Sequence, residues 1–202
     1  MDRRLFLHTC TATAAGGVAL ASSGAAVAPK PDGLFADAPL KMSIPPGWFR
    51  GTSMEDKLEG VAEWGFPAYE WLSPSGDIDQ LRAKMDELGL KLSCIGGAGA
   101  IAPRQMVDPT DHDRVEAQFR ARIELGRKLD CTTLIGLTGN ERDDVSRDEQ
   151  TKYVVQCLKR LAPIAEGEGV TIVMEALNVL VNHPGYFLVT TNHTMEILEA
   201  VD

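Results

Sequence analysis

The sequence predicts an α/β fold built on a parallel sheet, and two observations support this class. The candidate strands are continuous apolar and β-branched runs rather than alternating apolar and polar residues, which is typical of strands covered on both faces. A segment with apolar residues at helical spacing separates each candidate strand from the next. Such a repeat forms either a closed (β/α)8 barrel or an open doubly wound sheet, and the pattern allows both.

The repeat can be followed element by element past Pro39. Strands are predicted at 40–44, 67–72, 90–96, 131–137 and 170–177, and helices at 53–64, 77–88, 111–129 and 147–167, with a fifth from Asn192. Thr52 with Glu55 and Ser146 with Glu149 have the spacing of capping boxes, which satisfy first-turn amides. Three glycines stand where a helix would turn into the next strand, namely Gly65, Gly89 and Gly169.

The N-terminus has the pattern of an export signal rather than of the fold. Arg3 and Arg4 precede a low-charge stretch rich in alanine and glycine, and Ala26-Val27-Ala28 fits the small-residue cleavage rule. We therefore predict a twin-arginine-type signal over 1–28, a linker over 29–39 and the folded part over 40–202. A protein with this signal would be exported, to the periplasm or another extracytoplasmic space, and would not stay membrane-bound after signal removal.

Composition and charge limit the partners. The chain has 202 residues, of which 44% are apolar, with a formal net charge of −9, so one globular domain is expected and a nucleic acid or anionic membrane is not. Cys94, Cys131 and Cys157 form no Cys-x-x-Cys pair, and we expect buried free thiols. A small diffusible substrate suits this protein.

One motif after the third predicted strand is set aside. Gly97, Gly99 and Ala102 satisfy a dinucleotide-binding spacing, but Pro103 and Asp108-Pro109 follow where the phosphate-binding helix would begin. The motif lacks its structural context. We expect a loop at the carboxyl edge of the sheet.

The strongest functional signal is Glu175, at the end of the predicted strand 170–177. A carboxylate that ends an apolar strand is costly to bury unless it is paired or has a chemical role. Functional-looking polar residues also follow the other strands, and parallel α/β folds place their sites at these carboxyl ends. An ion pair inside the fold is the alternative for Glu175.

The segment 170–202 resembles the fifth βα unit of the xylose-isomerase-like TIM-barrel superfamily, and most closely its hydroxypyruvate-isomerase-type members. The matching pattern is a glutamate at the strand end, Leu-Asn, a short loop with a proline and a tyrosine, and a helix. It is carried by Glu175, Leu177, Asn178, Pro184, Tyr186, Phe187 and Leu188. The resemblance implies a (β/α)8 barrel of which about five βα units are present.

The resemblance also implies a chemistry. Family members move a proton between adjacent carbons of small hydroxy-carbonyl compounds through an enediol, usually with a divalent metal, and the residue matching Glu175 acts as a metal ligand, a proton-transferring carboxylate or both. Mg²⁺ or Mn²⁺ suits such an oxygen ligand. An epimerase of the same superfamily and a non-catalytic exported carbohydrate-binding barrel are the alternatives. An endonuclease is disfavoured by four histidines and the negative charge.

Other site candidates are Glu70, Asn178, His183 and Trp48, which we expect near substrate. Each also has a purely structural interpretation. Glu70 could form an ion pair with a neighbouring helix, and Asn178 could close the turn after the strand. His183 could lie in a solvated loop, and Trp48 could cap the core of the barrel. His112 and His193 sit beside Asp or Asn at helix starts, where capping explains their neighbourhood.

The resemblance places the remaining metal ligands and a second catalytic glutamate on later strands, beyond Asp202. A barrel of this type takes about 250 residues. We therefore expect that the sequence is a fragment, inactive alone, or else a short chain that must form a homo-oligomer.

Overall fold

The computed structural model describes residue 33, residues 35–36 and residues 39–201. The predicted signal over 1–28 lies outside the described residues, as does most of the predicted linker. Residues 31–202 form one compact unit. No helix among the described residues is long and apolar enough to cross a membrane.

The strands form two short parallel sheets that follow each other in chain order. One sheet joins β1 (Ser43–Ile44), β2 (Ala68–Tyr69) and β3 (Lys91–Leu92), and the other joins β4 (Ile95–Ala98), β5 (Thr133–Gly136) and β6 (Thr171–Met174). Among the described residues the strand order does not reverse, as it would at the switch point of a doubly wound sheet. This is the order of consecutive βα units in a (β/α)8 barrel, of which the described residues form a part.

The third predicted strand is interrupted between β3 and β4, a break that the sequence pattern did not reveal. Ser93 N donates to Tyr69 O at 2.8 Å and Gly96 N donates to Leu72 O at 2.8 Å, so the interrupted segment continues to follow β2. Beyond the break, β4 pairs with β5. The segment therefore links the two sheets into one curved series of strands.

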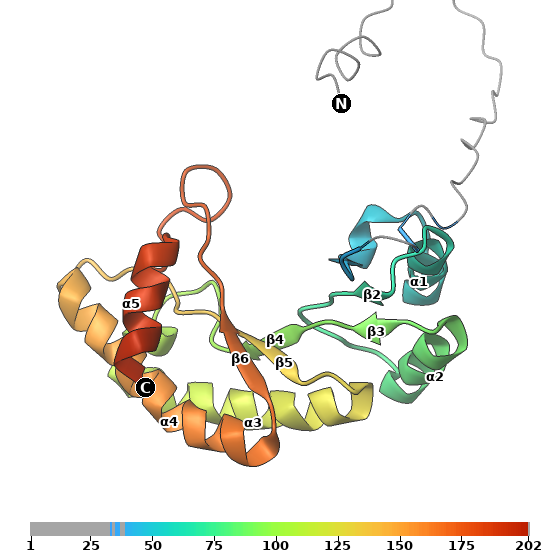
Figure 1. Ribbon diagram of the computed structural model, residues 1–202. Helices are drawn as coiled ribbons and strands as arrows, with labels where there is room; N and C mark the ends of the chain where they lie inside the picture. The colour runs from blue at the N-terminus through green and yellow to red at the C-terminus, as the bar shows by residue number, and fades with distance from the viewer. Residues whose placement is uncertain (1–32, 34, 37–38, 202) are drawn as a thin grey trace, which may run out of the picture. The chain divides into compact units, whose positions relative to one another are not determined.

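The helices occupy one side of this series. They are α1 (Met54–Glu63), α2 (Ile78–Leu88), α3 (His112–Leu129), α4 (Arg147–Glu168) and α5 (Thr191–Val201). Each contacts the next in chain order, and α3 and α4 pack against β4 and β6, respectively (Figure 1). This is the outer ring of a barrel. The core lies between strands and helices, with fully buried residues such as Leu58, Phe119, Leu134 and Leu161.

Capping side chains mark the starts of the helices, and the first capping box lies one residue later in the chain than predicted. The first capping box pairs Ser53 with Asp56 rather than Thr52 with Glu55: Asp56 N donates to Ser53 Oγ, and Asp56 Oδ2 accepts from Ser53 N, both at 3.1 Å. Asp56 stands at the third helical position, where its carboxylate reaches back to the cap. At the fourth helix, Ser146 Oγ accepts from Glu149 N at 3.3 Å, which is one half of the predicted capping box, while the Glu149 carboxylate accepts from Lys152 Nζ at 2.9 Å.

The glycine prediction is confirmed, and the prediction of buried free thiols is confirmed for Cys131 and Cys157 but not for Cys94, which is only partly buried. Gly89 and Gly169 end α2 and α4 with φ of 66° and 65°, and Gly65 has φ of 79°, conformations that side chains disfavour. All three cysteines of the described residues are free, Cys131 and Cys157 being buried. Burial raises the pKa of the Cys157 thiol to about 12, so it is an inert core residue.

Candidate functional site

Glu175 follows β6 directly and lies on the face of the sheet away from the helices. Its neighbour Met174 packs against the helix-side core together with Ile172. Side chains alternate along a strand, so Glu175 shares the opposite face with Val173, which is 38% exposed. That face is the inside of the barrel, and Glu175 stands at its carboxyl end, where barrels of this type place their chemistry.

Glu70 is brought to the same inner face from β2. The preceding Tyr69 is fully buried in the hydrophobic core cluster, so we place Glu70 on the opposite face by the same alternation. Cys94 Sγ donates a weak hydrogen bond to Glu70 Oε2 at 3.8 Å. Burial raises the pKa of the Cys94 thiol to about 11. The thiol is therefore neutral near pH 7 and able to donate this hydrogen bond.

The pKa of Glu175 is affected by its burial and by the charges of Glu70 and His183. Partial burial raises the pKa of the Glu175 carboxyl, the negative charge of Glu70 raises it further, and His183 opposes both. A carboxylate with a raised pKa is a stronger base than an ordinary glutamate. The arrangement can therefore exchange a proton with a bound molecule on the inner face.

The remaining site candidates take other positions. Asn178 Oδ1 accepts from Leu180 N at 2.8 Å, and His183 N donates to Asn178 O at 3.0 Å, so Asn178 closes the loop after β6 as its structural interpretation predicted. The Trp48 side chain is 80% exposed in a short 3-10 helix over Pro46–Trp48, so it lines no apolar wall. Substrate contacts by Asn178, His183 and Trp48 stay predictions.

The two helix-start histidines have structural partners. His112 is buried, and its Nε2 lies 3.0 Å from Met106 O. His193 Nε2 lies 2.9 Å from Thr151 Oγ1, and its ring packs edge-on against Phe187. Neither histidine needs a ligand role.

The described residues do not provide a metal site. No group of three or more His, Cys, Asp or Glu side chains in this part of the chain is arranged to hold a metal ion. Glu175 supplies an oxygen ligand of the kind that Mg²⁺ prefers, but one carboxylate does not fill the octahedral shell of that ion. These residues therefore do not form a complete divalent-metal centre by themselves.

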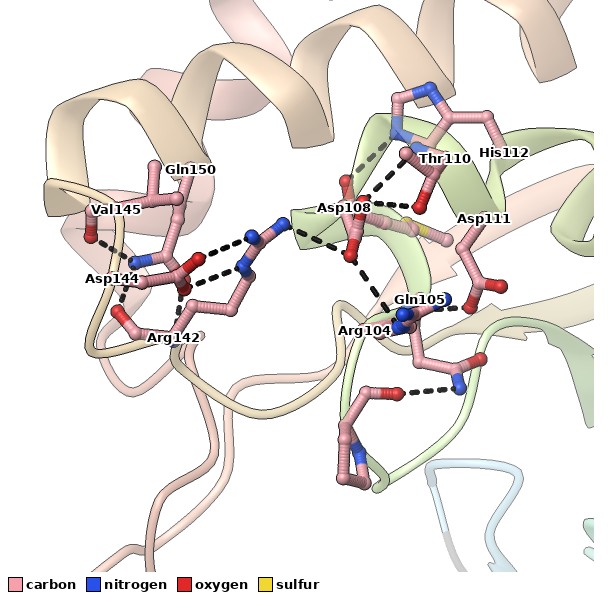
Figure 2. A network of polar contacts seen from close by, with 12 residues as sticks. Arg104, Gln105, Asp108, Thr110, Asp111, His112, Arg142, Asp144, Val145 and Gln150 are labelled. Atoms are coloured by element: carbon pink, nitrogen blue, oxygen red, sulfur yellow. Dashed lines mark hydrogen bonds and ion pairs between the residues drawn. The ribbon is translucent and has the colours of Figure 1, made fainter.

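A polar network that sequence reasoning missed surrounds Asp108, in the loop between β4 and α3 (Figure 2). Arg142 Nη1 lies 2.9 Å from Asp108 Oδ2, and Arg142 also forms two hydrogen bonds with Asp144, at 3.0 and 2.8 Å. Burial would raise the pKa of Asp108, but hydrogen bonds from Thr110 and the charges of Arg142 and Arg104 lower it overall. Since Arg142 lies 34 positions from Asp108, no local pattern reveals the pair.

Beside this network lies a cavity of about 520 Å³. Its lining is polar and comes from the loops after β4, β5 and β6: Pro103, Arg104, Asp108, Asn140, Glu141, Arg142, Asp143 and Gly185. The loop predicted from Gly97 begins only at Gly99, because Gly97 and Ala98 still belong to β4, and it leads into this rim. Glu175 and Glu70 do not line this cavity.

Comparison with known proteins gives a family match and curated relatives. The family model described as a xylose isomerase-like TIM barrel matches residues 58–202. A protein of Danio rerio, provisionally named a hydroxypyruvate isomerase, is 27% identical over 178 residues, which cover 82% of this chain and 64% of the relative. The chain thus spans less than two thirds of that relative's length.

Solved structures share the fold. An AP endonuclease family 2 protein from Brucella melitensis has a TM-score of 0.70 at 18% identity, covering 79% of this chain and 63% of that one. A D-psicose 3-epimerase from Clostridium cellulolyticum H10, solved with D-tagatose, gives 0.62 at 20%, with coverage of 81% and 60%. The IolI protein, solved with a bound zinc atom, gives 0.65 at 19%, with coverage of 80% and 59%. At these identities the likeness concerns the fold, in which some members bind metal.

Proposed function

Because the chain belongs to the xylose isomerase-like TIM-barrel family, we propose that it serves proton transfer between adjacent carbons of a small hydroxy-carbonyl compound or sugar. Glu175 is the proton-transferring carboxylate. One observation carries the proposal: Glu175 ends β6 on the inner face, with its pKa raised by burial and by the charge of Glu70. The name of the Danio rerio relative supports an isomerase within this class.

The chain's own residues supply part of such a reaction. Removal of a proton next to a carbonyl needs a base close to that carbon, and Glu175 is a base strengthened by its surroundings. Glu70 keeps a second negative charge beside it and so favours the protonated form of Glu175 once the proton has been taken up. The developing oxyanion needs a separate stabilising group. A Mg²⁺ or Mn²⁺ ion with Glu175 among its ligands is part of the proposal, and its other ligands are not among the described residues.

The test is hydrogen exchange between substrate and solvent. The chain, and any longer protein that contains it, is incubated in D₂O with hydroxypyruvate, with and without Mg²⁺ or Mn²⁺, and deuterium at the carbon next to the carbonyl is followed by NMR; exchange is expected where the chain has the remaining groups of the site. Glu175→Gln should reduce incorporation by about a hundredfold or more, since general-base groups contribute that order. Glu166→Gln is the matched control, because Glu166 is exposed on α4.

Two other functions are separated by the same experiment. A ketose epimerase shares the proton chemistry, is supported by the fold of the D-psicose 3-epimerase, and would label D-psicose or D-tagatose instead of hydroxypyruvate. A non-catalytic carbohydrate-binding barrel would bind sugar without any incorporation, and that result would contradict the proposal. Cleavage of abasic DNA would do the same, although the net charge of −9 disfavours it.

Export through the predicted signal over 1–28 is also part of the proposal. It rests on Arg3, Arg4 and the small residues at 26–28. Replacing both arginines by lysine should retain the protein in the cytoplasmic fraction of a host with twin-arginine export. Unchanged distribution between fractions would contradict export by this route.

A further inference from the structure

The pairing of β5 with β6 determines which backbone groups should meet beside Glu175. Thr171 N donates to Thr132 O at 2.8 Å, and Glu175 N donates to Gly136 O at 3.3 Å. In a parallel pair the donors alternate between strands at even spacing. With Gly136 level with Met174, the next hydrogen bond of this register would run from Thr138 N to Glu175 O.

A side-chain hydroxyl stands in place of that bond. Thr138 N donates to the phenol oxygen of Tyr186 at 3.0 Å, and the same hydroxyl donates to Glu175 O at 3.2 Å. Tyr186 is 1% exposed and Thr138 is fully buried. The phenol therefore satisfies both backbone groups that the register would have paired directly, and it holds the two strand ends one hydroxyl group apart.

Backbone hydrogen bonds of the loop after β6 fix the position of the Tyr186 ring. Tyr186 forms an antiparallel bridge with Asn140, and Phe187 N donates to Gly139 O at 3.0 Å. Leu177 N donates to Leu188 O at 3.0 Å, which closes the loop on itself. The segment 186–188 is thus fixed to the ends of both strands, and the position of the Tyr186 hydroxyl is set by the backbone on either side.

We propose that Tyr186 is a positioning residue for Glu175: its hydroxyl replaces one backbone hydrogen bond between β5 and β6 and so sets where the carboxylate stands on the inner face. The functional part of this inference rests on the proposed function. Without the hydroxyl, the strand ends either close on each other or leave two buried backbone groups unpaired. Both outcomes move Glu175.

The test compares two tyrosine-to-phenylalanine changes. Tyr186→Phe removes a hydroxyl that makes two hydrogen bonds, whereas Tyr69→Phe removes an equally buried hydroxyl that has no hydrogen-bond partner in the described part of the chain. We expect Tyr186→Phe to lower kcat for solvent exchange by about tenfold or more with KM changed less than about twofold, because small displacements of a catalytic group cost rate. Tyr69→Phe should leave both constants unchanged.

A second readout does not depend on activity. The ¹³C chemical shifts of the Glu175 carboxyl and carbonyl carbons, measured at one fixed pH without metal, should differ from wild type in Tyr186→Phe and not in Tyr69→Phe. A Tyr186 variant whose shifts match those of Tyr69→Phe would overturn the proposal, whereas absence of exchange in the wild type would contradict only the proposed function.

A measurement on the wild-type chain covers the case in which Tyr186→Phe does not fold. The Tyr186 hydroxyl proton should show a nuclear Overhauser contact with the Thr138 amide proton. A direct hydrogen-bond coupling between Thr138 N and the Glu175 carbonyl would show that no hydroxyl intervenes and would overturn the proposal.

Discussion

Replacing Arg104 by glycine should stabilise the fold, because Arg104 has a strained backbone. Its φ and ψ are 68° and −124°, and Gln105 follows with φ of 72°. Glycine adopts such angles readily, whereas a Cβ atom is crowded there. The loop is held by close packing: a Cβ at Gly139 would come within 2.1 Å of Arg104 O. Gln105 N also donates to Asp111 Oδ2 at 2.9 Å.

The expected change in the free energy of unfolding caused by Arg104→Gly is the sum of three contributions. Relief of backbone strain of this kind should stabilise the glycine variant by about 1–3 kcal/mol. The greater entropy of its unfolded chain should destabilise the same variant by about 0.5–1 kcal/mol. The Arg104 side chain is 66% exposed and its Nε lies 3.7 Å from Asp108 Oδ2, so the lost ion pair contributes about 0–1 kcal/mol. Arg142 still pairs with Asp108.

Arg104→Ala is the matched control, because it loses the same side chain and keeps the strain. The glycine variant should therefore be more stable than the alanine variant by about 1 kcal/mol, the balance of strain relief and chain entropy. Urea unfolding of both at pH 7, followed by tryptophan fluorescence, gives the midpoints and slopes that measure this difference. An alanine variant as stable as the glycine variant would refute the assignment of strain to Arg104.

Two further predictions concern Gly139 and His193. Gly139→Ala should lower the free energy of unfolding by roughly 2–4 kcal/mol, because the φ of Gly139 is 96° and the added Cβ would strike the backbone of Arg104. Gly76 has φ of 87° but open space around it, so Gly76→Ala should lower the free energy of unfolding by only about 1–2 kcal/mol. Equal losses in urea unfolding would contradict the steric explanation. Burial and the charge of Arg147 lower the pKa of His193 from 6.5, against smaller effects of Glu196 and Glu141. The unfolded chain therefore binds this proton more readily, and the free energy of unfolding should fall as pH drops below 6.5. His193→Gln should flatten the slope of Tm against pH in this range, and an unchanged slope would rule His193 out as its source.

Local patterns predicted the secondary structure well because they depend on neighbours in the chain. The helix from His112 to Leu129 follows from apolar residues at helical spacing, and it ends close to the predicted boundary. The break at Ser93 and Cys94 was not predicted, since it comes from the change of pairing partner between β3 and β4. The first capping box was predicted at Thr52 and Glu55 but lies at Ser53 and Asp56. The two pairs have the same spacing one residue apart, so the sequence did not distinguish them.

The site was predicted only in part. A carboxylate at the end of an apolar strand indicated Glu175, and the same position after another strand indicated Glu70. The role of Tyr186 could not be seen, because its partners Thr138 and Glu175 are 48 and 11 positions away. Its place in the loop pattern that carries the family resemblance was its only signal in the sequence.

The sequence by itself determined the α/β class, the order of helices and strands and the carboxylate that ends β6, because apolar spacing, caps and glycines act over a few residues. Only the tertiary structure decided that Glu175 and Glu70 share one face and that the charge of Glu70 helps to raise the pKa of Glu175. It also decided that a phenol hydroxyl separates the strand ends beside Glu175. These features depend on the register of strands far apart in the chain, and a hydrogen-bond partner is selected by distance in space rather than by spacing in sequence.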